Sequence, residues 1–301
     1  MKKLGKKIQK LRLDKSLTRE TICGDESELS IRQLARIEKG QSIPSLAKVL
    51  FIAKKLDLPV VELINPDCLV LPKRYKELKY LILRRPTYTN GQNLVDREAQ
   101  FDEIFEDYYA TLPEEEQLII DLLQSRFDVY QSGDTNYGKE LLREYISQIR
   151  KKKSYALNDI FLIDLYLTCG MVSNFKEELF DKGNFDCFTN KLVLLEDKLE
   201  LKDLFLLNNV LLTSIAVGIS IKEYQKTRIL LNVCRRIMTI TQDFQRMPIY
   251  YMYEWKYTLF YMKDSQKAYY YYRQSLIFAR TLTDNYLVNR LKTSWELDNQ
   301  S

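Results

Sequence analysis

The spacing of apolar residues constrains the fold of this chain more than any other feature. From about residue 73 almost to the C-terminus, apolar residues recur with a helical period, most clearly over 101–109, 114–130, 157–167 and 201–217. No convincing run of strand-like alternation between apolar and polar residues interrupts this pattern. The sequence therefore predicts an all-α fold.

Short polar turns separate these helical stretches, which is typical of antiparallel hairpins stacked as an α-solenoid. The hairpin at 250–282 carries the clearest signature. After a turn at 263–265, its second helix has Ala268, Tyr272, Ser275 and Leu276 at the spacing of a tetratricopeptide (TPR) repeat. We expect the tyrosines at 269–272 to fill the space between stacked hairpins, with a ligand cage as the alternative.

The composition disfavours an enzyme. The chain has no histidine, which removes catalytic triads, paired-histidine zinc sites and histidine-ligated haem. Its nine glycines form no phosphate-binding or nucleophile motif, and its five cysteines include no CxxC pair. We expect no catalytic residue, no metal and no cofactor.

The positive charge is concentrated at the N-terminus. The chain has 46 basic and 41 acidic residues. Residues 1–64 contain 14 of the basic and 8 of the acidic residues, so the remainder contains 32 basic and 33 acidic residues. A basic segment beside a neutral body is typical of a module that contacts phosphate. Prolines cluster just after it, so we expect a DNA-binding domain at 1–64, a linker at 65–73 and a second domain at 74–301.

The chain lacks the features of a secreted or membrane protein. Lysines alternate with apolar residues at the N-terminus, unlike a signal peptide. No apolar run approaches the roughly 18 residues that a membrane span needs. We expect a cytoplasmic protein without a membrane partner.

Residues 4–64 are predicted to form five short helices. The first covers 4–13, the second begins after Thr18 as N-cap, and the third begins after Ser30 and ends before Gly40. The last two are expected at 45–56 and 60–64. This segment resembles the XRE/Cro-type helix-turn-helix family. The resemblance is carried by Ser30-Ile31-Arg32-Gln33-Leu34-Ala35-Arg36-Ile37-Glu38-Lys39-Gly40, followed by Pro44-Ser45 and the stretch 52–56.

The third of these helices carries the candidate base-reading residues. Its apolar residues share one face, so Arg32, Gln33 and Arg36 are expected to point outward. Arginine can read guanine and glutamine can read adenine in the major groove, and the resemblance places the start of this helix, including Ser30, against DNA. Arg19 is expected to contact phosphate. The alternative is an ordinary solvated helix face.

An XRE-type domain followed by TPR-like hairpins resembles the Rgg/PlcR (RRNPP) group of quorum-sensing regulators, and within it the ComR-type regulators of streptococci. The segments that carry this likeness are 28–34, 36–40, Pro86-Thr87-Tyr88 and Leu112-Pro113-Glu114-Glu115-Glu116. The resemblance implies that the solenoid binds a short, hydrophobic, re-imported signalling peptide, and that binding permits homodimerisation on a palindromic promoter site, most simply as an activator.

The same resemblance suggests residues for peptide binding and for a switch. Asn208 and Asn209, within an apolar helix, are candidates to hold the peptide backbone, with a buried structural role as the alternative. Thr89 and Arg97 fall where the family approaches the peptide's end. Arg32 is expected to pair with Glu114 in the absence of peptide, with a solvated acidic helix start as the alternative.

Two other functions remain open on the sequence. The chain could be a TPR-type protein-interaction regulator that uses its N-terminal domain for docking, or a phage-like repressor without a peptide ligand. The sequence specifies neither the peptide nor the operator, nor the oligomeric state before activation.

Overall fold

The computed structural model describes residues 2–63, 71–84, 91–176 and 178–300, and every regular element in these ranges is a helix. The prediction of an all-α fold is confirmed. The described residues divide into two compact units: unit 1 contains 2–63, 71–84, 95–125 and 140–154, and unit 2 contains 91–94, 126–139, 155–176 and 178–300. The first 63 residues thus share a unit with later helices. The predicted domain limits at 64 and 74 stay a prediction, and most of the predicted linker lies outside the described residues.

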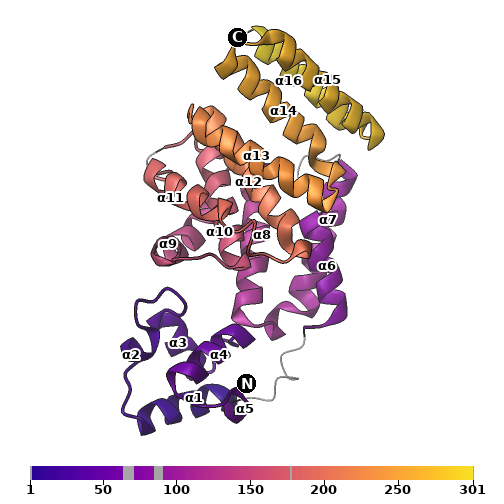
Figure 1. Ribbon diagram of the computed structural model, residues 1–301. Helices are drawn as coiled ribbons and strands as arrows, with labels where there is room; N and C mark the ends of the chain where they lie inside the picture. Colours follow the sequence, from indigo (N-terminus) through magenta and orange to yellow (C-terminus); the bar gives the residue numbers. More distant parts are fainter. Residues whose placement is uncertain (1, 64–70, 85–90, 177, 301) are drawn as a thin grey trace. The chain divides into compact units, whose positions relative to one another are not determined.

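Five helices form the N-terminal part of unit 1 (Figure 1): α1 (Lys2–Asp14), α2 (Arg19–Cys23), α3 (Ile31–Glu38), α4 (Leu46–Lys55) and α5 (Val60–Leu63). Local sequence signals set their limits as predicted. The Thr18 side chain accepts a hydrogen bond from the Thr21 backbone at 3.1 Å, and Ser30 caps α3 in the same way. Gly40 follows α3 with a φ of 69°, a left-handed conformation that glycine adopts at low cost.

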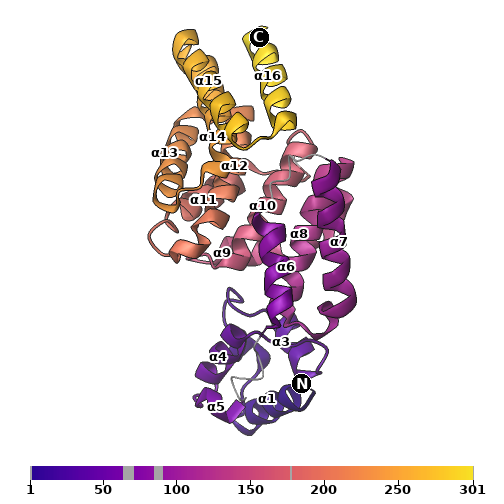
Figure 2. The ribbon, with the colours of Figure 1, turned by 90° about the vertical axis from the view of Figure 1, so that its right-hand side faces the viewer.

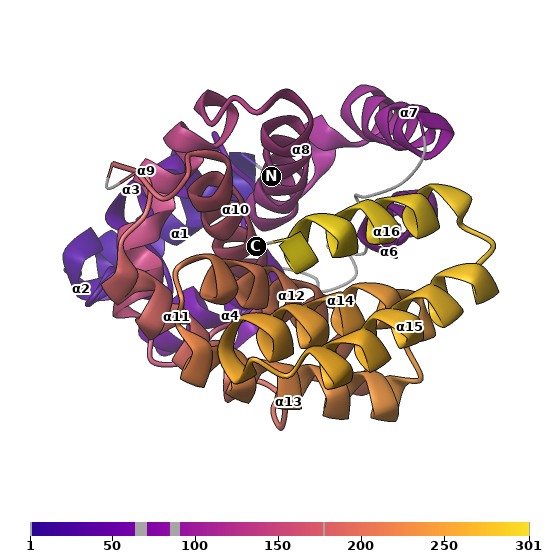
Figure 3. The ribbon, with the colours of Figure 1, turned by 90° about the horizontal axis from the view of Figure 1, so that it is seen from above.

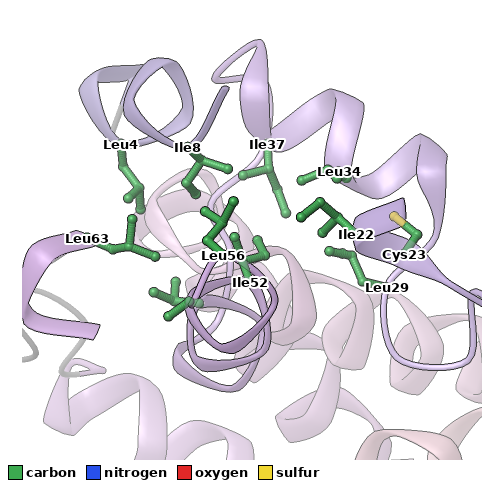
Figure 4. Packing of buried hydrophobic residues seen from close by; sticks show 12 residues of the cluster. Leu4, Ile8, Ile22, Cys23, Leu29, Leu34, Ile37, Ile52, Leu56 and Leu63 are labelled. Atoms are coloured by element: carbon green, nitrogen blue, oxygen red, sulfur yellow. The ribbon is translucent and has the colours of Figure 1, made fainter. Parts of the chain in front are cut away.

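A compact apolar core joins these five helices. Figure 4 shows the side chains of α1, α3 and α4, among them Ile8, Ile37 and Ile52, pointing toward one another. Helix α1 approaches the end of α3 so closely that a Cβ atom on Gly5 would lie 2.0 Å from the Ile37 carbonyl oxygen. Only glycine permits this contact, which positions α3 against α1.

Four longer helices follow: α6 (Lys73–Arg84), α7 (Gly91–Asp107), α8 (Glu114–Ser132) and α9 (Asn136–Lys151). Helices α6, α7 and α8 lie side by side (Figure 2). Glu116 in the first turn of α8 accepts hydrogen bonds from Tyr75 at 2.6 Å and from Lys79 at 2.7 Å. These bonds from α6 fix the start of α8, which is important for the site described below.

Unit 2 is built mainly from seven helices: α10 (Leu157–Val172), α11 (Lys182–Val193), α12 (Leu204–Ser220), α13 (Tyr224–Thr241), α14 (Met247–Tyr257), α15 (Ser265–Thr281) and α16 (Asn285–Gln300). The segment Leu201–Ser220 is long and apolar enough to cross a membrane by length and composition. The expectation that no apolar run approaches that length is therefore wrong. Because 72% of its apolar window is buried in the fold, the segment serves here as a core helix.

The C-terminal hairpin has the predicted TPR-like packing. Helix α15 packs against both α14 and α16, and the three helices are neighbours in Figure 3. Ala268 and Ser275 are buried, as their spacing indicates. Tyr272 stacks on Trp295 at 4.7 Å between ring centroids. However, Tyr269 and Tyr270 are 51% and 55% exposed, so the tyrosine run fills the space between helices only in part. Four consecutive positions on a helix cannot all face inward.

Candidate functional site

Helix α3 presents two arginines and hides the glutamine that we expected beside them. Arg32 keeps 72% of its side chain exposed and lies 3.5 Å from Glu144 of α9. Gln33, by contrast, is only 4% exposed. Its side-chain oxygen accepts a hydrogen bond from the Ser30 backbone at 3.0 Å, while the Ser30 hydroxyl accepts one from the Gln33 backbone at 3.1 Å.

The prediction that Gln33 points outward is therefore wrong for this structure. The physical reason is the reciprocal capping bond, which turns the glutamine side chain back over the first turn of the helix. Ser30 is likewise engaged as the N-cap. The exposed polar face of α3 consists of Arg32 and, one turn later, Arg36.

Arg19 lies at the edge of a buried ion cluster. The Glu38 side chain is fully buried, and its carboxylate binds Arg12 at 2.6 Å and Arg19 at 2.8 Å. The hydrogen bond with Glu38 raises the pKa of the Arg12 guanidinium. Arg19 keeps 32% of its side chain exposed, so it combines a structural bond with a surface that can still meet phosphate.

The start of α8 contacts the second half of α3 and the loop after it. The Glu114 backbone N–H donates to the Ile43 carbonyl at 2.6 Å, and the Glu114 carboxylate lies 3.3 Å from Arg36. This carboxylate is buried, and neither of its oxygens has a hydrogen-bond partner. Nearby, Glu115 lies 3.8 Å from Lys48 of α4. Arg36 is thus the cation that compensates a buried acid.

The predicted pair between Arg32 and Glu114 is not the one that forms. The bond from Glu114 to Ile43 holds the start of α8 beside the C-terminal half of α3, where Arg36 lies. Arg32 sits one helical turn nearer the N-terminus on the same face, and there it meets Glu144 instead. Each arginine of the exposed face therefore has its own acidic partner.

Helix α9 contributes two further contacts that the sequence did not indicate. Tyr145 shares a hydrogen bond with Gln33, and burial, reinforced by the carboxylates of Glu144 and Glu114, raises its pKa to about 12. Gln148 donates to the Ser27 carbonyl, in the loop before α3, at 3.4 Å. In sequence, Gln148 looks like the solvated side of an amphipathic helix, while Tyr145 continues the apolar stripe of Leu142 and Ile149. No local signal indicates that either residue contacts α3 or the loop before it.

The predicted peptide-binding residues have different surroundings. Thr89 lies outside the described residues. Arg97 is buried and donates to the Ile82 carbonyl of α6 at 3.2 Å. Asn208 is fully buried, and neither atom of its amide has a hydrogen-bond partner. Asn209 accepts a hydrogen bond from Arg246, which fits the structural alternative.

Arg246 is a neighbour of this region that the sequence did not suggest. It is buried, pairs with Asp243 at 2.8 Å and lies over the Phe205 ring at 5.9 Å. Among the residues that the structure describes, no cluster of acidic or cysteine side chains could hold a metal ion.

Several known proteins resemble this chain. The model of the ComR tetratricopeptide family matches residues 72–295. The crystal structure of ComR from Streptococcus suis is 38% identical, with a TM-score of 0.80, over 99% of this chain and 95% of that one. A comparison with curated protein sequences gave no match.

Two structures of a second relative allow a further comparison. The apo form of ComR from S. thermophilus is 26% identical, with a TM-score of 0.82, over 98% of each chain. The same protein in complex with DNA and its signalling peptide ComS is also 26% identical, over 98% of this chain and 99% of that one, but has a TM-score of 0.67. The resemblance to ComR-type regulators is confirmed, and the chain belongs to the ComR tetratricopeptide family.

Proposed function

We propose that this chain is a cytoplasmic transcriptional regulator, not an enzyme, whose DNA-reading helix is held inactive until a short signalling peptide binds. One observation carries this proposal: both arginines on the exposed face of α3 are paired with carboxylates of α8 and α9. An arginine reads guanine through the same N–H groups that bind a carboxylate. The acids and a promoter therefore compete for Arg32 and Arg36.

A solved relative supports the choice of partners. ComR from S. thermophilus, 26% identical to this chain, has been solved in complex with DNA and its signalling peptide ComS. In the proposed active state, peptide binding separates α3 from α8 and α9, and two copies then bind a palindromic promoter site as an activator.

The residues divide into roles accordingly. Arg32 and Arg36 read bases, while Arg19 contacts phosphate at the edge of the Glu38 cluster. Ser30 and Gln33 shape the start of α3. Four residues remain candidates for the peptide site, as the family resemblance implies: Thr89, Arg97, Asn208 and Asn209.

Neutralising the two acids tests the proposal without a known peptide. The double variant Glu114→Gln/Glu144→Gln should bind DNA more tightly than the parent chain, because the arginines no longer have a charged competitor. The two pairs together are expected to contribute on the order of 1–2 kcal/mol, which predicts roughly a tenfold gain in affinity. Selection from a random-sequence duplex pool, followed by anisotropy titration on the selected duplex, measures this gain.

A matched control separates masking from a general charge effect. Glu140→Gln removes the same charge from an exposed position of α9, and should leave DNA affinity within twofold of the parent. A double variant that binds no better than this control would refute the masking of α3. If no chain selects a preferred sequence from the pool, DNA recognition itself is refuted.

A further inference from the structure

Helices α13 and α15 of unit 2 contain seven basic residues and no acidic residue, although residues 65–301 as a whole have 32 basic and 33 acidic residues. Three of the seven pair with acids of other segments: Lys226, Arg228 and Arg236. The other four are exposed and form no ion pair within the described part of the chain: Arg235, Lys267, Arg273 and Arg280. These two helices are therefore a locally basic part of a nearly neutral region, which attracts anions.

Aromatic rings between these helices form a stacked row, which we call the aromatic row. Phe244, shortly after α13, lies 6.4 Å from Phe278 of α15 between ring centroids, and Phe278 lies 5.7 Å from Tyr251 of α14. Tyr251 lies 6.1 Å from Tyr271 of α15, and Tyr270 adjoins Tyr271 at 5.5 Å. The two outer rings, Phe244 and Tyr270, are 54% and 55% exposed. The aromatic row therefore presents a ring to solvent at each end.

The cations without an acidic partner border the aromatic row. Burial raises the pKa of Tyr271, and the positive charge of Arg235 opposes this rise, so Arg235 lies close to the rings on the α13 side. On α15, Arg273 follows Tyr270 by three residues, a spacing that makes the two side chains neighbours on a helix surface. Arg280 follows Arg273 after two further turns and points to the same side. Exposed rings and free guanidinium groups thus alternate on one surface.

Packing between helices explains only a part of this surface. The half-buried rings fill the space between α13, α14 and α15, as large side chains do in stacked helical hairpins. Phe244, Tyr270 and Ile277, however, keep about half of their surface in water. A single exposed apolar residue needs no explanation, but these three lie beside cations that have no acidic partner. The combination fits a ligand that brings both flat apolar groups and negative charges.

We infer that the aromatic row binds single-stranded nucleic acid, with bases stacked on Phe244 and Tyr270 and with phosphates bound by the four free cations. Each nucleotide of a single strand joins an unpaired base to a phosphate, which matches the two kinds of surface found here. A duplex keeps its bases stacked inside and would leave the rings unused. This site is separate from α3, so the inference goes beyond the proposed function and does not depend on it.

Anisotropy titration of the full chain with labelled oligonucleotides tests the role of the rings. One probe is a strand of about twenty thymidines, and the other is an abasic strand of the same length and charge. The parent chain should bind the thymidine strand about thirtyfold more tightly, from the lower end of base-stacking energies at two rings. The variant Phe244→Ala/Tyr270→Ala should lose this preference and still bind the abasic strand within about twofold of the parent. Its tryptophan emission, from Trp255 and Trp295 of unit 2, should stay that of the parent.

The salt dependence of thymidine-strand binding tests the role of the cations. The triple variant Arg235→Gln/Arg273→Gln/Arg280→Gln should lower the slope of log affinity against log salt concentration by about 2, because each phosphate contact of a single strand contributes about 0.7. The matched control Lys202→Gln/Lys222→Gln/Lys292→Gln removes three charges from exposed positions of unit 2 outside these two helices. It should keep the slope of the parent chain, which excludes a nonspecific effect of net charge.

A duplex probe separates this site from the DNA-reading helix. Duplex affinity depends on unit 1 in the proposed function, so it should be the same in the parent and in Phe244→Ala/Tyr270→Ala. Equal binding of the thymidine and abasic strands by the parent, or equal slopes of the arginine and lysine triple variants, overturns the inference. An equal loss of duplex and single-strand affinity in the ring variant also overturns it, because the surface would then bind phosphate without reading unpaired bases.

Discussion

Truncation of Glu38 to alanine should destabilise the N-terminal part of unit 1 more than the removal of any charged side chain from its surface. The Glu38 carboxylate is fully buried and binds Arg12 through two bonds, at 2.6 Å and 3.2 Å. It also binds Arg19, whose Nη2 and Nε lie 2.8 Å and 2.9 Å from one of its oxygens. Without it, Arg12, whose side chain is only 8% exposed, retains the Leu17 carbonyl as its acceptor at 2.7 Å. Because arginine does not lose its proton in proteins, the positive charge of Arg12 would remain buried without an ionic partner.

The size of the effect follows from what remains buried. Removing one partner of a buried ion pair costs about 3–5 kcal/mol, and we expect about 3 kcal/mol here because the long Arg12 side chain can partly reach water. Arg19→Ala should cost only about 1 kcal/mol, since that side chain is partly exposed. In the double variant Arg12→Met/Glu38→Met, both charges disappear together, so the loss should fall to within about 1 kcal/mol of the parent.

Hydrogen exchange of the full chain measures these losses locally. Both tryptophans, Trp255 and Trp295, lie in unit 2, so their fluorescence does not report on α1 and α3. Amides of these two helices should exchange about a hundredfold faster in Glu38→Ala, and at the parental rate in the exposed control Glu28→Ala. Equal effects of Glu38→Ala and Arg19→Ala, or a double methionine variant as unstable as Glu38→Ala, would refute the reasoning.

Three further predictions test other parts of unit 1. Gly5→Ala should destabilise α1 and α3 by about 1–3 kcal/mol through overlap with the Ile37 carbonyl oxygen, seen as faster exchange in both helices; parental exchange would contradict it. Burial raises the pKa of Asp121 although Tyr109 donates to its carboxylate at 2.8 Å, so the folded state holds the proton to higher pH. Stability should therefore fall as pH rises from the ordinary pKa of aspartate to the raised one, and urea unfolding of Asp121→Asn should lack this fall. Arg32→Met in the Glu114→Gln/Glu144→Gln background should reduce discrimination at one base pair by about 1–3 kcal/mol, measured by anisotropy with matched and mismatched duplexes.

Features governed by neighbours in sequence were predictable. Thr18, Ser30 and Gly40 set the limits of α2 and α3 through bonds that each span three residues. The spacing of Ala268 and Ser275 likewise predicted which face of α15 is buried. Such signals need only the geometry of a helix, so the sequence alone indicates them.

The site depended on information that no short segment contains. Helical periodicity placed Gln33 outward, but the capping bond with Ser30 competes with solvent for its side chain and prevails. Periodicity also placed Arg32 and Arg36 on one face without indicating which of them faces Glu114. That choice depends on the bond between Glu114 and the Ile43 carbonyl, which joins positions far apart in the chain.

The energies of the two arginine pairs suggest how the proposed switch is balanced. The pair of Arg32 with Glu144 is largely exposed, at 72% and 30% of the two side chains, and such pairs contribute less than about 1 kcal/mol. The pair of Arg36 with Glu114 is more enclosed, at 37% and 5%, and Glu114 has no other cation within the described residues. Opening the site therefore costs most at Glu114, where the more enclosed of the two pairs is lost.

A peptide present at a hundred times its dissociation constant supplies about 2.7 kcal/mol, which is enough to offset a masking energy of 1–2 kcal/mol. If the two pairs together stabilised the closed state by much more than about 2.7 kcal/mol, α3 would stay closed even with peptide bound. If they stabilised it by much less than about 1 kcal/mol, α3 would bind the promoter without peptide. One enclosed pair and one exposed pair together supply a closing energy in the required range. Moving the acid of Glu144 into a buried position would lock the regulator, whereas neutralising Glu114 alone would release most of it.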